Sequence, residues 1–137
     1  MEEVAGNSPA ARLHLKVWTQ HSTLNTKHST LNTHRLLADG DDLAFVTVSL
    51  TDAEGNLIPD ASDQLTFDVS GAGTFEAVCN GDATSLESFK APTMRLFHGQ
   101  LVVIVRSTKT PGTITLRVTD PQRQLSHAIT LRSERLQ

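Results

Sequence analysis

Three histidines in one short segment are the first candidates for chemistry, because imidazole is a good ligand for zinc, copper or nickel. His21, His28 and His34 lie in the tandem copies HSTLNTK and HSTLNTH, which are identical at six positions. No cysteine or carboxylate joins them locally, and flexible His-rich segments bind such metals adventitiously. We therefore interpret residues 21–34 as a duplicated linker that forms a loop or weak hairpin, with a native metal site as the alternative, and we predict no metal site.

Two other groups of reactive side chains have simpler interpretations. Cys79 is the single cysteine, so an internal disulfide is excluded, and no histidine or other base lies near it in the sequence. We expect a small buried hydrophobe there rather than a nucleophile. Asp39, Asp41 and Asp42 put three carboxylates in four residues, but calcium takes about six to eight oxygens and no distal bidentate glutamate follows. We expect a solvated turn, and nothing in the sequence predicts a cofactor.

The stretch 80–98 is the longest irregular one apart from the duplicated segment, and long loops in compact domains are usually functional or mobile. Its polar side chains could present a docking or ligand surface, or they could only lock the start of the loop through hydrogen bonds to the backbone. The residues of this candidate surface are Asn80, Gly81, Asp82, Glu87 and Lys90.

Charge and hydropathy exclude several classes of partner. The 137 residues carry a net charge of −3 with no long basic run, which disfavours nucleic acid and anionic membranes. The longest apolar run, residues 101–105, is too short to span a bilayer. The N-terminus has neither a basic start nor an apolar core, so we expect no signal peptide. The length fits one domain, and we predict a flexible lead over residues 1–10 and a single domain over residues 11–134.

Hydrophobic alternation predicts the strands that must position these side chains. Within Ala38–Ala61, every second residue from Ala44 to Leu50 is apolar, and Gly- and Asp-rich turns lie on both sides. About seven short strands with turns between them and no helix predict an all-β protein, an antiparallel β-sandwich. The predicted strands are Arg12–Trp18, a central strand within Ala38–Ala61, Gln64–Val69, Thr74–Cys79, Gly99–Arg106, Thr113–Thr119 and Leu125–Leu131.

The same alternation assigns side chains to faces. Phe75, Ala77 and Cys79 share the predicted inward face of their strand. His127 falls on the apolar side of the last strand, where we expect a partly buried structural histidine rather than a ligand. Gly99–Arg106 is apolar on both faces, as expected of a strand that is covered on both sides, whereas Arg12–Trp18 is expected at a sheet edge.

Two stretches carry a resemblance to known domains. LADGDDLAFVTVSLTDAEGNLIPDA is similar to a pattern of bacterial immunoglobulin-like domains that invasin-type adhesin modules share. The next stretch, LTFDVSGAGTFEAVCNGDATSLESFKAPTMRLFHGQLVVIVRS, resembles the C-terminal immunoglobulin-like domain of family 2 glycoside hydrolases, the bacterial β-galactosidase group. The resemblance covers residues 36–134. This sequence departs from the family in the duplicated segment at 21–34 and at Cys79, where the family more often has Asp.

The resemblance implies an immunoglobulin-like sandwich that is an accessory domain excised from a bacterial β-galactosidase. Retaining enzymes of this kind use two carboxylates roughly 5–5.5 Å apart, held in a separate barrel of about 250 residues that this chain lacks. We therefore expect no enzyme here and no catalytic role for Glu76 or Glu87. The implied role is to pack against or position the catalytic barrel of a parent that hydrolyses O-glycosidic bonds in carbohydrate metabolism.

Two alternatives to this role remain, a carbohydrate-binding module and an adhesin-type repeat. Stacking on a sugar would depend on Trp18, Phe89 and Phe97. The expected partners are other domains of the parent and, second, a glycan, with no nucleic acid and no membrane. Because a redundant connection follows an edge strand, we also expect a weak homodimer by exchange of Arg12–Trp18. The chain leaves its localisation unknown, and we favour a periplasmic or secreted parent.

Overall fold

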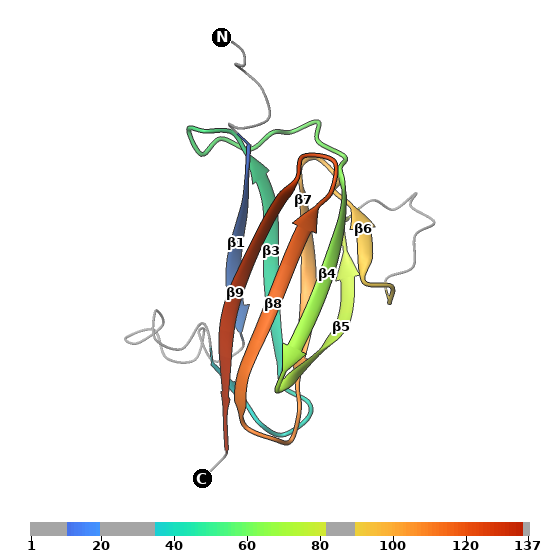
Figure 1. Cartoon of the computed structure of the whole chain (residues 1–137). Helices are drawn as coiled ribbons and strands as arrows, with labels where there is room; N and C mark the ends of the chain where they lie inside the picture. The colour runs from blue at the N-terminus through green and yellow to red at the C-terminus, as the bar shows by residue number, and fades with distance from the viewer. Residues whose placement is uncertain (1–10, 20–34, 82–89, 136–137) are drawn as a thin grey trace.

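The computed structural model describes residues 11–19, 35–81 and 90–135, which form two β-sheets packed face to face (Figure 1). One sheet has the strand order β1-β3-β7-β5, and the other has the order β2-β9-β8-β4-β6. No helix occurs among the described residues, which confirms the all-β, immunoglobulin-like sandwich. The strands are β1 (Arg12–Thr19), β2 (Arg35–Leu37), β3 (Leu43–Thr51), β4 (Gln64–Gly71), β5 (Gly73–Cys79), β6 (Thr93–Arg95), β7 (Gln100–Ser107), β8 (Gly112–Asp120) and β9 (Leu125–Glu134).

The core lies between the two sheets and consists of aliphatic side chains at alternate strand positions. Each fully buried Val, Leu or Ile contributes about 1.5–3 kcal/mol, so two aliphatic inner faces hold the domain without a disulfide. Phe67 of β4 stacks on Phe75 of β5 at a centroid distance of 6.4 Å, which joins the two sheets. The predicted inward residues of β3 and β8 are all fully buried: Ala44, Val46, Val48, Leu50, Ile114, Leu116 and Val118.

The edge position predicted for the first strand is confirmed. β1 lies at the end of the four-stranded sheet, and its one partner among the described strands is β3, antiparallel, from Arg12 opposite Thr51 to Thr19 opposite Ala44. The turn predicted after β3 is also present. The backbone N–H of Asp52 donates to the carbonyl of Asn56 at 2.8 Å, and this turn follows directly on the end of β3 at Thr51.

Two short strands, β2 and β6, lie at the two edges of the five-stranded sheet and were not predicted. Each has three residues, which is too short for a period-2 pattern to stand out from a loop. β2 pairs parallel with β9, so the sandwich is not wholly antiparallel. β6 lies inside the stretch predicted to be irregular, pairs with β4 and buries Met94 completely.

A β-bulge in β5 makes the predicted inward face of this strand wrong. The register with β7 shifts between Phe75 and Ala77, which leaves Glu76 as an extra residue. Phe75 packs against the core, but beyond the bulge the buried residue is Val78. Cys79 is therefore exposed and is not the buried hydrophobe that we predicted. One inserted residue reverses the alternation of all that follow it, and only the pairing with β7 reveals it.

His127 is exposed, so the prediction of a partly buried histidine is wrong. It lies opposite Val118 in the β8–β9 register. β2 pairs with β9 only over residues 132–134. Among the described strands, the end of β9 that carries His127 is therefore paired with β8 alone. The outward residues of β7, Val102 and Ile104, are half-buried, and the chain covers β7 fully on its inner face only.

Several predictions concern residues outside the described ranges. The lead at 1–10, the duplicated segment at 21–34 and its three histidines lie there, so the domain boundaries stay predictions. In the described ranges no helix has the length and apolar character that a membrane span requires. Nor do any three His, Cys, Asp or Glu side chains of these ranges come together in a way that could hold a metal ion.

Candidate functional site

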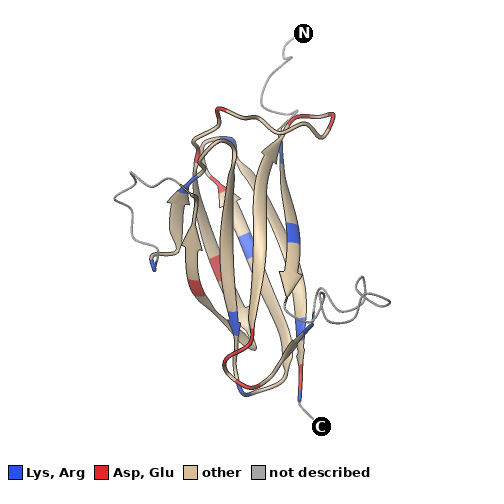
Figure 2. Ribbon diagram, turned by 180° about the vertical axis from the view of Figure 1, so that it is seen from behind, with Lys and Arg blue, Asp and Glu red and all other residues tan. Residues whose placement is uncertain are grey.

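The outward surfaces of the two sheets differ sharply in chemistry. The five-stranded sheet presents hydroxyl and charged side chains, as a sheet that faces water does. The four-stranded sheet has long uncharged stretches (Figure 2), and β3 contains no Lys, Arg, Asp or Glu at all. The outward residues of β4, β8 and β9 include Thr66, Asp68, Thr113, Thr115, Arg117, Thr119, Ser126 and Thr130.

An apolar row crosses the four-stranded sheet on its outward side. The register places Trp18 opposite Phe45, Phe45 opposite Ile104, and Ile104 opposite Ala77, so the row includes one residue from each strand. The Trp18 and Phe45 rings meet edge to face at a centroid distance of 5.0 Å. Trp18 remains 47% exposed, although an indole ring is among the most costly side chains to leave in water.

A hollow of about 420 Å³ adjoins this row. Its floor is the next outward row of the sheet, where Thr47 lies opposite Val102 and Val102 lies opposite Cys79. Its wall is formed by residues of the loops at the ends of β5 and β7: Asn80, Gly81, Phe97 and His98. A second, more polar hollow of about 260 Å³ follows along the same face, and Gln100 lines both.

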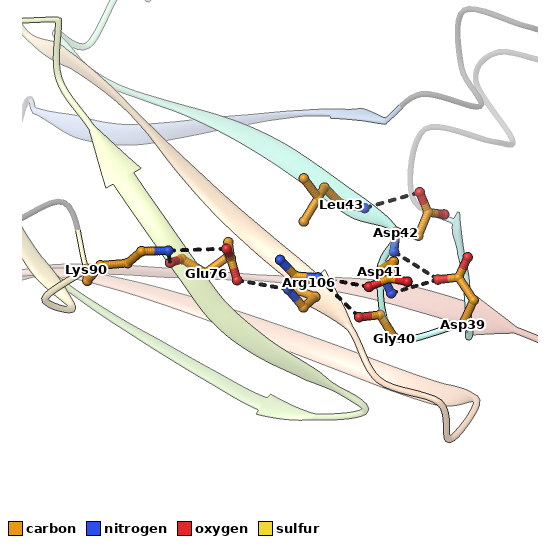
Figure 3. Close-up of polar contacts among 8 residues, drawn as sticks. All are labelled: Asp39, Gly40, Asp41, Asp42, Leu43, Glu76, Lys90 and Arg106. Carbon is orange, nitrogen blue, oxygen red and sulfur yellow. Dashed lines mark hydrogen bonds and ion pairs between the residues drawn. The ribbon is translucent and has the colours of Figure 1, made fainter.

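A chain of ion pairs around Glu76 and Arg106 lies on the side of the apolar row opposite to the hollow; Figure 3 shows these ion pairs. Arg106 Nε donates to Glu76 Oε1 at 2.9 Å, and Lys90 Nζ donates to Glu76 Oε2 at 3.2 Å. Arg106 Nη1 also reaches Asp41 Oδ1 at 3.2 Å and the Gly40 carbonyl at 3.3 Å. Glu76 lies on the outward side that simple alternation from Phe75 already predicts, and the bulge that sequence reasoning missed adds Ala77 and Cys79 to that side.

These cations decide the protonation state of Glu76. Hydrogen bonds from Arg106 and then from Lys90 outweigh the desolvation of the carboxyl and lower the pKa of Glu76 to about 2. The same contact with Glu76 raises the pKa of Arg106. A carboxylate held ionised in this way cannot donate a proton to a leaving group near neutral pH. Glu76 therefore has the environment of a structural ion pair, not that of a general acid.

The aspartates at 39–42 act on the backbone. Asp39 Oδ1 accepts from the N–H groups of Asp41 and Asp42 at 2.8 and 2.9 Å. Asp42 is 7% exposed and accepts from the N–H of Leu37 at 2.7 Å. The turn is therefore partly buried, whereas we predicted a solvated turn. Their carboxylates are turned toward N–H donors and Arg106, which is the arrangement of a capped turn rather than that of a calcium loop.

The structure divides the candidate surface predicted from the sequence between two sides of one sheet face. Asn80 and Gly81 line the hollow, and the side-chain amide of Asn80 also donates to the carbonyl of Arg95 at 2.9 Å. Lys90 joins the ion pairs at the other side of the same sheet face. Asp82 and Glu87 lie outside the described residues. Sequence reasoning missed the apolar row between these points, although the two-sided apolar run at 101–105 was its signal.

A buried pair of acids lies at one end of the sandwich, and no local pattern in the sequence predicts it. Asp120 is fully buried at the end of β8, and Asp63 is 6% exposed just before β4. Arg123 Nε donates to Asp63 Oδ2 at 2.6 Å. The backbone N–H groups of Gln122 and Arg123 donate to Asp120 Oδ1, while its buried Oδ2 has no donor.

Protonation of Asp120 would let this carboxyl donate a hydrogen bond to Asp63. Burial, followed by the hydrogen bond and negative charge of Asp63, raises the pKa of Asp120 to about 6. Burial alone would raise the pKa of Asp63 too, but hydrogen bonds from protonated Asp120 and from Arg123 outweigh it and lower that pKa. Two such carboxyls with separated pKa values resemble a catalytic dyad, but this pair is closed from solvent and serves to tie the β8–β9 turn to the start of β4.

Comparison with known proteins places this fold in a family context. The model of the family described as glycoside hydrolase family 2 C-terminal domain 5 matches residues 28–128. Beta-galactosidase BoGH2A of Bacteroides ovatus is 42% identical over 84 residues, which cover 61% of this chain and 10% of that protein. The chain thus spans about a tenth of the length of this curated relative.

Solved structures agree with this match. A glycosyl hydrolase family 2 member from Bacteroides cellulosilyticus superposes with a TM-score of 0.77 at 25% identity, covering 92% of this chain and 14% of that one. A beta-glycosidase from Bacteroides vulgatus superposes with a TM-score of 0.73 at 25% identity, covering 90% of this chain and 14% of that one. In both, the similar region is one part of a much longer polypeptide.

Proposed function

The chain belongs to the family of glycoside hydrolase family 2 C-terminal domains of type 5, and from this premise we propose that it is a non-catalytic accessory domain of a longer glycosidase. In the proposal it packs against other domains of that parent and helps to position the catalytic barrel. The parent would hydrolyse O-glycosidic bonds, with a β-galactoside as its substrate, in carbohydrate metabolism. The observation that carries the proposal is the family match over residues 28–128.

The structure supports a binding role over a catalytic one. Glu76 is held in ion pairs with Arg106 and Lys90, which neutralise its charge. The one acid pair with separated pKa values, Asp63 and Asp120 among the described residues, is buried. We also propose that the surface predicted from the sequence takes part in the contact with the parent. Asn80 and Gly81 lie at one side of the four-stranded sheet and Lys90 lies at the other. Asp82 and Glu87 are the remaining residues of this predicted surface.

A direct test separates an accessory domain from an enzyme. The purified chain should not turn over chromogenic β-galactosides, because the described residues form a β-sandwich and not the barrel that would hold the acid and the nucleophile. The parent with and without this domain should then be compared for melting temperature and activity. Loss of either on removal of the domain supports the proposal. Turnover by the chain that survives repurification and disappears in Glu76→Gln would refute it.

A carbohydrate-binding module is the second candidate, and Trp18 is the observation that favours it. Trp18 is 47% exposed at the edge of the sheet, where a sugar could stack on its ring. Phe97 is half-buried and Phe89 lies outside the described residues. Titration of the chain with galacto-oligosaccharides, followed by tryptophan fluorescence, distinguishes the two functions. A saturable change that is lost in Trp18→Ala supports sugar binding, and a flat response supports the structural role. The adhesin-type repeat is disfavoured by the family match.

A further inference from the structure

We propose that the outward face of the four-stranded sheet docks against a neighbouring domain of the same parent polypeptide. This inference rests on the proposed function and adds to it the surface and the occupant. We call this surface the outer sheet face. It consists of two outward rows, Trp18–Phe45–Ile104–Ala77 and Lys16–Thr47–Val102–Cys79, so the one charged side chain in these rows is Lys16 on the edge strand.

The first argument is the difference between the two outward surfaces of one small domain. A sheet with one face in water alternates apolar residues inside with polar residues outside. The five-stranded sheet obeys this rule with threonines, as in β8, where Thr113, Thr115 and Thr119 point outward. The four-stranded sheet breaks it in its central strands, where Phe45 and Ile104 point outward as a cross-strand pair. Apolar side chains at the centre of a sheet face are typical of a face that another layer covers.

The second argument is the arrangement of the polar groups around the apolar row. The ion pairs of Glu76 with Arg106 and Lys90 lie on one side of it. On the other side lies the hollow of about 420 Å³ that Asn80 and His98 help to line. Apolar centres with polar rims are characteristic of protein interfaces. The hollow can receive a protruding apolar side chain, and the polar rim can be satisfied at the border.

The size of the outer sheet face selects the occupant. Four strands about 4.8 Å apart and outward rows about 7 Å apart give two rows an area on the order of 300 Å². A stable free dimer buries about 800 Å² per partner, whereas contacts between domains of one chain total only about 600–1,500 Å² over both surfaces. A contact this small needs a tether. The family supplies one, because the matched relatives are polypeptides of which this domain is a tenth to a seventh.

Cys79 provides a probe for this contact. It is exposed, is the single cysteine of the chain, and lies on the outer sheet face opposite Val102. Its alkylation by a maleimide is followed by mass spectrometry of the Cys79 peptide, in the isolated chain and in the parent. The tether gives the docked domain an effective concentration on the order of 1 mM. If the contact has a Kd of about 0.1 mM, the face is covered about ten times as often as it is free, and we expect Cys79 to be labelled about tenfold more slowly in the parent.

A matched pair of substitutions locates the contact. Ile104→Lys places a charge on the outer sheet face, and Thr115→Lys places the same charge at an equally half-buried outward position on the other sheet. In the parent, Ile104→Lys should restore the fast labelling of the isolated chain and Thr115→Lys should leave it slow. Melting of the isolated variants shows whether each one folds. Trp18→Ser, at the exposed end of the row, repeats the test if Ile104→Lys does not fold.

The outcomes separate this inference from the proposed function. Equal labelling of Cys79 in the parent and in the isolated chain overturns the docking face, and a lower melting temperature of the parent without the domain would show that the accessory role still holds. If neither effect appears, both proposals fail. A dimer of the isolated chain in sedimentation that Ile104→Lys abolishes assigns the face to a second copy and overturns the inference. Labelling slowed by galacto-oligosaccharide assigns it to a glycan and overturns it as well.

Discussion

Replacement of Asp120 by asparagine should make the protein more stable at neutral pH. In the wild type, ionised Asp120 is buried beside ionised Asp63, and its Oδ2 has no donor. Asparagine keeps the oxygen that accepts from the N–H groups of Gln122 and Arg123, and it adds an N–H that can donate to Asp63. It therefore reproduces the protonated form of Asp120 at every pH.

The magnitude follows from the pKa of Asp120. A rise from the ordinary 3.8 to about 6 corresponds to about 3 kcal/mol between its two protonation states. Because the folded pKa lies above the unfolded one, folding takes up a proton between these values. The stability that Asp120 contributes is thus complete below pH 3.8 and is lost as the pH rises through 6. Asp63, with a lowered pKa, acts with the opposite sign, but only below its ordinary 3.8.

Urea denaturation of both proteins between pH 4 and pH 8 measures this effect. We expect Asp120→Asn to be more stable than the wild type by about 2–3 kcal/mol at pH 7.5 and by less than about 1 kcal/mol at pH 4. Asp68→Asn, at an exposed position of β4, is the control and should follow the wild-type curve. Parallel stability curves for the wild type and Asp120→Asn, or a less stable variant at pH 7.5, would refute the proton-sharing argument.

Three further outcomes follow from the structure. Glu76→Gln should reduce stability at pH 7 by up to about 1 kcal/mol, a small effect because the ion pair is partly exposed. Since the pKa of Glu76 is lowered from 4.5 to about 2, the difference in stability between the wild type and this variant should disappear in thermal melts as the pH falls through that range. Gly99→Ala should lower the free energy of unfolding in urea by about 2–4 kcal/mol, because φ is +79° and a Cβ would lie 2.4 Å from the Ile58 carbonyl oxygen. Gly55→Ala, at φ +87° with open space around it, should lower it by only about 1–2 kcal/mol. Deletion of residues 28–34 should leave the fold intact and reduce the amount of any strand-exchanged dimer that light scattering detects at high concentration. An unchanged amount of dimer after the deletion would contradict exchange of the edge strand β1.

The sequence by itself determined the class of the fold and most of its core. Alternation in β3, β7 and β8 is a local property of each strand, because side chains at i and i+2 point the same way whatever the strand pairs with. Burial of Val46, Val103 and Leu116 could therefore be predicted strand by strand. The resemblance to family 2 accessory domains, confirmed by the family match, also depended on the linear pattern alone.

The tertiary structure alone decided where the surfaces and charges lie. Pairing with β7 reveals the bulge at Glu76, which turns Ala77 and Cys79 outward. The same pairing brings Glu76 within reach of Arg106. Asp63 and Arg123 meet although 60 residues separate them in the chain. The physical reason is that a strand pattern says which residues share a face but not which strands lie side by side. Register, bulges and the contacts of distant turns arise only when the two sheets assemble, and they build both the outer sheet face and the buried acid pair.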